Sequence, residues 1–252
     1  MARPHRHLIA CLLPLLLSAP FAHAQTAQKP KAVVELFTSQ SCSSCPPADA
    51  LMVELSRDPD VVALTLPVTY WDYLGWKDTL GQDAFSKRQK LYAKARGDNQ
   101  IYTPQAVING TSHMIGSEKS EIHKRIADIA ADPLDATITL IEDGGTLRIA
   151  LAPLPGAPET PGSVWVLPTS RAVTVPITRG ENQGKTVSYA NVVRGLMRVG
   201  SWDGKAGEIR VPIAATQAPD ADGYVVIVQA EKPGRFGYTY PGEILAAARS
   251  GR

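Results

Sequence analysis

The sequence predicts two unlike halves, an α/β domain followed by an all-β, sandwich-like domain. In residues 25–133, apolar runs of strand length alternate with stretches whose apolar residues recur at helical spacing. In residues 134–252, short β-branched runs are separated by turns rich in Gly and Pro, at the spacing of a β-sandwich. A length of 252 residues is sufficient for two modest domains.

Residues 1–24 have the composition of a signal peptide. Arg3 and Arg6 give a basic start, residues 8–17 are apolar, and residues 22–24 form a small-x-small cleavage site. We therefore expect a periplasmic or secreted protein. No later segment is long and apolar enough to span a bilayer, so we expect no integral membrane segment after signal removal.

The charge of the mature chain argues against a nucleic-acid partner. Removing residues 1–24 removes two arginines and no acid, which leaves 24 basic and 24 acidic residues. A nucleic-acid-binding domain needs an excess of basic residues on one face. Cys11 leaves with the signal, so Cys42 and Cys45 are the cysteines that remain in an oxidising compartment.

The first half is arranged around a Cys-x-x-Cys motif. Residues 33–37 are an apolar run of strand length, a polar turn follows, and after Cys45 apolar residues recur at helical spacing. Pro46 and Pro47 are compatible only with the first helical turn, so Ser44 is the earliest N-cap. A Cys-x-x-Cys at a strand-to-helix turn is typical of a thioredoxin-like redox pair. We expect the Cys42 sulfur to face solvent and Cys45 to lie deeper and resolve a mixed disulfide.

The rest of this half supplies the other elements of such a domain. Residues 61–66 predict a buried strand, residues 83–96 and 119–131 predict helices, and an Asn-Gly turn predicts a hairpin that includes residues 112–115. The order strand, helix, strand, helix, hairpin, helix is the minimal thioredoxin arrangement. Thr103 and Pro104 precede the hairpin. Trp71, Tyr73 and Trp76 lie in a dense aromatic segment, which is either core or lid packing or a substrate platform.

The second half shows a series of strand-like segments without repeats. They are residues 137–141, 146–152, 163–167, 172–177, 186–198, 208–213 and 224–229, with a short apolar segment at 243–249. A polar loop at residues 179–184 reads as an ordinary hairpin turn.

Several of these segments resemble a family of exported bacterial proteins, domain of unknown function 1223, which is placed in the thioredoxin-like group. The resemblance rests on residues 35–49, 70–78, 102–105, 109–110, 179–182 and 246–249. It implies a thioredoxin-like fold with a cis proline at Pro104, beside the cysteine pair. The family has no settled activity, so the resemblance implies no particular reaction.

The sequence therefore predicts an exported thiol–disulfide oxidoreductase-like protein. Cys42 and Cys45 would be catalytic, and Thr103, Pro104, Trp71, Tyr73 and Trp76 would contact the substrate. The partners would be protein thiols or disulfides, and no cofactor or metal is needed, because the chemistry is exchange between sulfurs. The alternative is a non-enzymatic envelope binding module with a permanent disulfide. A copper or zinc carrier, with His113 or His123 completing the site, is a third possibility.

Overall fold

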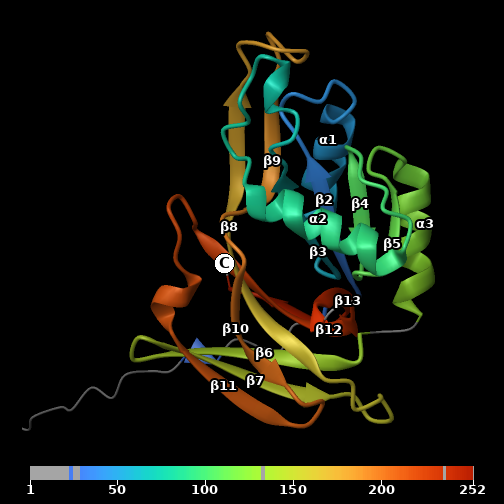
Figure 1. Ribbon diagram of the computed structural model, residues 1–252. Coiled ribbons are helices and arrows are strands. Elements are labelled where there is room, and N and C mark those ends of the chain that lie inside the picture. The colour runs from blue at the N-terminus through green and yellow to red at the C-terminus, as the bar shows by residue number, and fades with distance from the viewer. Residues whose placement is uncertain (1–22, 25–28, 132–133, 235–236, 252) are drawn as a thin grey trace, which may run out of the picture.

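The computed structural model describes residues 23–24, 29–131, 134–234 and 237–251 (Figure 1). Residues 1–22 of the predicted signal peptide lie outside the described part. The predicted domain boundary, between residues 133 and 134, lies at its edge. In chain order the elements are β1 (His23–Ala24), β2 (Ala32–Thr38), α1 (Pro46–Leu55), β3 (Val61–Pro67), η1 (Asp72–Leu74), α2 (Asp83–Arg96), β4 (Gln105–Ile108), β5 (Ser112–Ile115), α3 (Lys119–Ala130), β6 (Ala136–Asp143), β7 (Thr146–Pro153), β8 (Gly162–Pro176), β9 (Thr186–Val193), β10 (Met197–Trp202), β11 (Gly207–Pro212), η2 (Ile213–Thr216), β12 (Gly223–Pro233) and β13 (Thr239–Arg249). No helix in the described segments is long and apolar enough to cross a membrane.

The predicted fold class, a thioredoxin-like α/β domain followed by a separate all-β domain, is wrong. Strands of both halves form one large mixed sheet with the order β13-β12-β8-β9-β3-β2-β4-β5, and β10 pairs with β8. The join lies between β3 and β9, which run parallel and pair at Thr65 and Val192. Thr65 is fully buried and its hydroxyl donates a hydrogen bond to the Ala190 carbonyl, 2.6 Å away. Strand β9 thus covers an edge of β3 that an independent first domain would leave open.

Strand β8 carries this sheet from one half of the molecule to the other. Its beginning pairs with β12 and β10, and its end pairs with β9. The sequence suggests two strands here, at residues 163–167 and 172–177, but the structure has one. The predicted strand at residues 186–198 is instead divided into β9 and β10.

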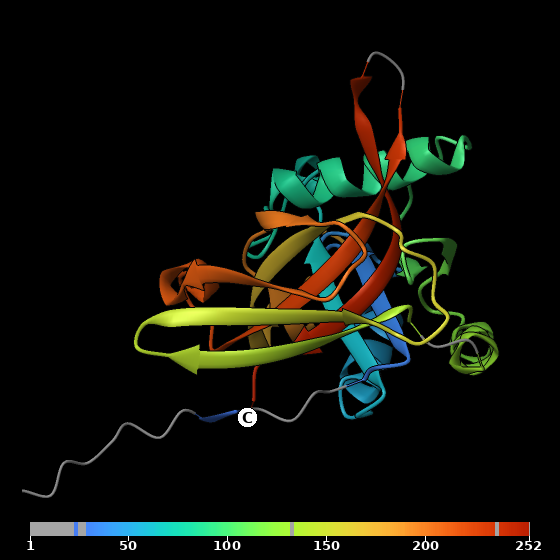
Figure 2. The ribbon, with the colours of Figure 1, turned by 90° about the horizontal axis from the view of Figure 1, so that it is seen from below.

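Helix α1, helix α2 and a second sheet pack on the two faces of the large sheet. Alternate residues of β2 point to opposite faces. Val34 and Leu36 contact the buried residues of α1, while Val33 and Phe37 share a core with Phe85 and Tyr92 of α2. The second, four-stranded sheet (β1-β6-β7-β11) packs against the β8, β12 and β13 end (Figures 1 and 2). Helix α1 also contacts β9, so the helix that follows the cysteine motif rests on a strand from the second half.

Candidate disulfide site

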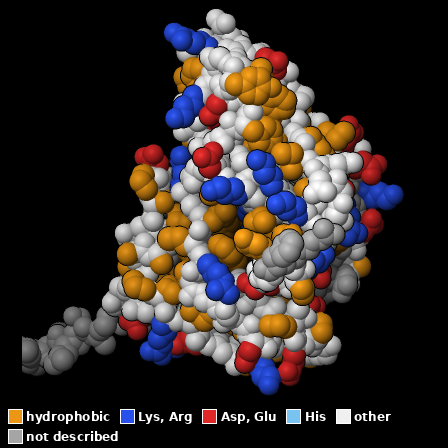
Figure 3. Space-filling view, in the orientation of Figure 1, with side chains coloured by type: hydrophobic (Ala, Val, Ile, Leu, Met, Phe, Trp, Pro, Cys, Tyr) orange, Lys and Arg blue, Asp and Glu red, His pale blue; other side chains and the backbone are white. Residues whose placement is uncertain are grey.

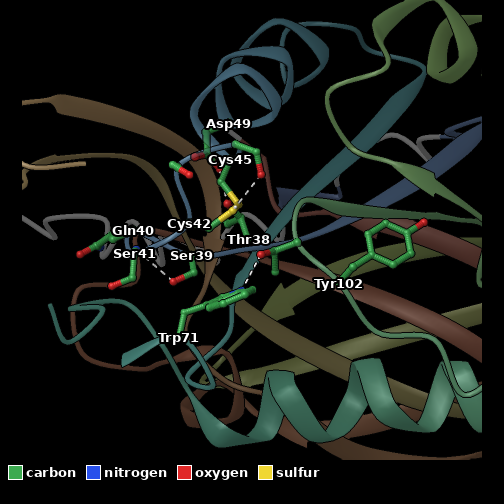
Figure 4. Close-up of a disulfide and its surroundings, with 12 residues drawn as sticks. Thr38, Ser39, Gln40, Ser41, Cys42, Cys45, Asp49, Trp71 and Tyr102 are labelled. Atoms are coloured by element: carbon green, nitrogen blue, oxygen red, sulfur yellow. Dashed lines mark hydrogen bonds between the residues drawn. A yellow bond between two sulfur atoms is a disulfide. The ribbon is translucent and has the colours of Figure 1, made fainter. Parts of the chain in front are cut away.

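Cys42 and Cys45 form a disulfide at the start of α1, with their Cα atoms 5.4 Å apart (Figure 4). The N-cap of the helix is Cys45, one residue later than the predicted Ser44, because Pro46 and Pro47 occupy the first two helical positions. Neither proline has an N–H, so the helix offers fewer donors to a Cys42 thiolate than an ordinary N-terminus. The Ser44 hydroxyl lies 3.4 Å from the Cys42 sulfur and is a hydrogen-bond partner for it.

Cys42 is more buried than the sequence suggests. Only 5% of its surface is exposed, and Cys45 is fully buried. The expected order holds, since Cys42 is the more accessible of the two. The expectation that the Cys42 sulfur is open to solvent is wrong, because residues from the surrounding loops cover the motif.

The loop between β8 and β9 (residues 177–185) is one of these covers. The side-chain amide of Asn182, which is 1% exposed, donates hydrogen bonds to the carbonyls of Gln40 (2.9 Å) and Cys42 (2.8 Å). Glu181 accepts a hydrogen bond from the backbone N–H of Ser43 at 3.2 Å. The sequence reads this segment as an ordinary hairpin turn. Its contact with the cysteine motif is made across about 140 residues, so no local pattern could indicate it.

Asp78 and Trp76 hold the preceding turn, residues 39–41, from the other side. The Asp78 carboxylate accepts the backbone N–H of Gln40 at 2.7 Å, and the Trp76 indole donates to the Gln40 side chain at 2.7 Å. The Ser41 hydroxyl donates to the Trp76 carbonyl at 2.6 Å. Trp76, predicted to contact substrate, is half-buried, and its hydrogen bonds to Gln40 and Ser41 hold the turn before the cysteines.

The Thr103–Pro104 peptide bond is cis, as the family resemblance implies. The last residue pair between β2 and β4 is Phe37 with Gln105, so Pro104 lies one step further, alongside Thr38. A Cβ added to Gly116 would lie 3.1 Å from Pro104 and 3.3 Å from Ala48 of α1. Pro104 therefore packs beside the first turn of the helix that begins at Cys45.

Two of the predicted aromatic residues lie at the same place. The Trp71 indole donates a hydrogen bond to the Thr103 hydroxyl at 2.7 Å, and the rings of Trp71 and Tyr73 are 6.1 Å apart. Tyr73 is 76% exposed. In Figure 4, Trp71 lies between the disulfide and α2, and Tyr102 lies to the right of the disulfide. The structure thus brings Thr103, Pro104, Trp71 and Tyr73 together, with Pro104 beside the helix that begins at Cys45.

Asp49 is a buried acid that was not among the residues predicted for the site. It lies one helical turn after Cys45, is 1% exposed, and accepts a hydrogen bond from the Thr38 hydroxyl at 2.7 Å through Oδ1. Its Oδ2 has no hydrogen-bond partner among the described residues, and neither does the hydroxyl of Tyr189 on β9. Burial raises the pKa of Asp49 to about 8, against the opposing effect of Thr38.

Glu35, the other acid near the motif, is fully engaged elsewhere. It is completely buried on the opposite face of β2 from α1, and its carboxylate forms a two-pronged ion pair with Arg88, at 2.6 and 3.1 Å. The Tyr92 hydroxyl donates to the same carboxylate. Glu35 is therefore a core ion-pair partner of α2, and the acid on the cysteine side is Asp49.

The two histidines considered as metal ligands, His113 and His123, are paired with acids instead. His113 is 3.2 Å from Asp98, and His123 is 3.4 Å from Glu54. Among the residues that the structure describes, no group of three or more His, Cys, Asp or Glu side chains is arranged to hold a metal ion.

Comparison with known proteins gives this fold and site a family. The model of the family described as "Protein of unknown function (DUF1223)" matches residues 33–229, and the chain belongs to this family. A crystal structure of a protein from Agrobacterium tumefaciens is similar, with a TM-score of 0.75 and 32% identity, over 88% of this chain and 94% of that one. HBP35 of Porphyromonas gingivalis has a TM-score of 0.54 at 12% identity, over 89% of this chain and 76% of that one, which is a likeness of fold alone. No curated protein matches the sequence.

Proposed function

We propose that the protein is an exported thiol–disulfide oxidoreductase, acting in the periplasm or outside the cell. The observation that carries the proposal is a closed Cys42–Cys45 disulfide at a helix start, with Pro104 packed beside the first turn of that helix. Such a pair reacts by sulfur exchange alone, so the partners are the thiols and disulfides of other proteins.

The exchange proceeds in two steps. In the reduced protein, the Cys42 thiolate attacks one sulfur of a partner disulfide, forms a Cys42–partner bond and releases the other partner sulfur as a thiolate. The Cys45 thiolate then attacks the Cys42 sulfur, closes the Cys42–Cys45 bond and releases the second partner sulfur. The partner disulfide gains two electrons and the cysteine pair loses two. The reverse sequence oxidises a partner dithiol.

Asp49 is suited to accept the proton of Cys45 in the second step. A buried thiol must lose its proton before it attacks. Asp49 lies one helical turn from Cys45, and its Oδ2 has no partner among the described residues. A pKa of about 8 makes its basicity comparable with that of a thiol. We assign Asp49 as the group that exchanges a proton with Cys45.

Thr103 offers a place for the partner chain. Its backbone N–H and carbonyl form no hydrogen bond with any described residue, although it lies where β4 begins. An extended partner segment can pair with such a free backbone, and the exposed ring of Tyr73 beside Trp71 gives it an apolar surface to cross.

The test is the activity of the pre-reduced protein towards the disulfides of insulin. We expect the wild type and a Ser43→Ala control to reduce insulin, and Cys42→Ser to lose the reaction. We expect Cys45→Ser to stop at the mixed disulfide, which is visible as a covalent adduct on a non-reducing gel. An unchanged rate with Cys42→Ser would refute the proposal.

A second candidate function has one observation in its favour, the burial of both sulfurs. A permanent disulfide in a non-enzymatic binding module would have the same structure. The two functions differ in how easily the bond is reduced, because structural disulfides have potentials below about −300 mV.

A further inference from the structure

A cavity of about 580 Å³ lies on the far side of α2 from the cysteine motif, between α2, β8, β10, β12 and β13. Its walls are largely apolar and include Leu91, Trp165, Leu196, Tyr240 and Pro241. Figure 3 shows hydrophobic side chains gathered in a hollow at the middle of this face, with Lys and Arg side chains around it. A largely apolar cavity of this size with a few polar groups is typical of a small-molecule site.

Two hydrogen-bond donors in the lining have no acceptor among the residues that the structure describes. The indoles of Trp71, Trp76 and Trp202 all donate hydrogen bonds, whereas the indole of Trp165 donates to none of the described residues. Arg88 uses Nε and Nη2 for Glu35, Tyr92 and Gln229, and its Nη1 makes no hydrogen bond to the described part of the chain. These donors favour a ligand that brings acceptor oxygens.

The charges at the rim favour an anion. Arg198 is offset by Glu231, which is 3.4 Å away and also accepts a hydrogen bond from Ser163. Lys87 lines the same cavity, is exposed, and forms no ion pair with the described residues. The rim thus carries one positive charge, that of Lys87, with no ion-pair partner in the described part of the chain, on the helix that also presents Arg88.

We propose that this cavity binds a small amphipathic anion, with an apolar body and one carboxylate, taken from solution. The carboxylate meets Lys87, Arg88 and the Trp165 indole. The apolar body lies against Leu91, Leu196 and Tyr240. The proposal is independent of the redox chemistry, because the lining contains neither cysteine and lies on the other side of α2.

Calorimetric titration of the oxidised mature chain with decanoate tests the site. We expect a dissociation constant tighter than about 1 mM. Decyltrimethylammonium has the same chain with a positive head and should bind at least about tenfold more weakly. Lys87→Gln and Trp165→Phe should each weaken decanoate binding about tenfold, because each removes a donor to the charged head. Lys90→Gln removes an exposed lysine from the same helix outside the cavity and should leave binding unchanged.

Several results would overturn the proposal. One is the absence of any heat of binding with decanoate, and another is equal affinity for the cation and the anion. Equal affinity in the wild type, Lys87→Gln and Trp165→Phe would show that the donors do not hold the head group. If free decanoate does not bind but the protein sediments with phosphatidylglycerol vesicles, the occupant is a membrane lipid and the proposal is wrong. A thermal melt of each variant confirms that a loss of binding occurs in a folded protein.

Discussion

The burial of the Asp49 carboxyl makes the free energy of unfolding of the whole protein depend on pH. Folding moves this carboxyl from water into the space between α1 and β9, and burial raises its pKa from 3.8 to about 8. In this interval the folded chain holds a proton that the unfolded chain has released. The free energy of unfolding therefore falls as the pH rises from about 4 to about 8.

Asp49→Asn should remove this dependence. Asparagine retains an oxygen for the Thr38 hydrogen bond and cannot ionise. We expect the variant to gain stability relative to the wild type as the pH rises, by at most about 1.4 kcal/mol per pH unit. Urea unfolding at pH 4, 6 and 8 measures the difference. Asp78, whose pKa burial raises to about 6, is present in both proteins and its contribution cancels. Parallel stability curves would show that Asp49 is ionised in the folded state.

Asn182 is an uncharged buried residue whose hydrogen bonds hold the β8–β9 loop over the cysteine motif. Its replacement tests whether this loop secures the motif. Asn182→Ala leaves the buried Gln40 carbonyl without a donor and the Cys42 carbonyl with only the backbone N–H of Cys45, which costs about 1–3 kcal/mol. Gln183→Ala, at the exposed neighbouring position, is the matched control and should cost little. We also expect dithiothreitol to reduce the disulfide faster in Asn182→Ala. Equal unfolding free energies and reduction rates in the two variants would show that the β8–β9 loop does not secure the motif.

At the scale of elements, local patterns in the sequence predict local structure well. The helix at residues 83–96 and the strand at residues 112–115 have the predicted limits, because helical spacing and an Asn-Gly turn are signals carried by adjacent residues. Strand β13 was predicted only as a short apolar segment. Its buried residues include three consecutive alanines, Ala246–248, which have a low preference for strands, and burial against β12 overrides that preference.

Some residues of the candidate site can be predicted from local sequence patterns, and others cannot. Cys42, Cys45 and Pro104 follow from motif and resemblance, and Trp71 from its aromatic neighbours. Asn182 and Asp49 Oδ2, which has no hydrogen-bond partner among the described residues, do not, because their roles depend on a strand and a loop more than 130 residues away along the chain. A single sequence holds no signal for such pairings when both segments look like ordinary surface turns or helix positions.

At the scale of the whole molecule, the continuous sheet predicts that the halves do not fold separately. A fragment of residues 29–131 exposes the β3 edge that Thr65 and Val192 close, and removes β9 from beneath α1. The buried core on the α2 face also contains residues from β8, β12 and β13. We expect the full mature chain to unfold in one cooperative urea transition, and the fragment to lack a cooperative transition by circular dichroism. A fragment with the midpoint of the full chain would restore the division into two domains.

The reduction potential of the Cys42–Cys45 pair tests the proposed function most directly. It is measured on the full mature chain by equilibration with glutathione or dithiothreitol buffers, with alkylation to count free thiols. A working oxidoreductase pair has a potential between about −120 and −270 mV, and we predict a value in this interval. A potential below about −300 mV would mark the disulfide as structural and contradict the account.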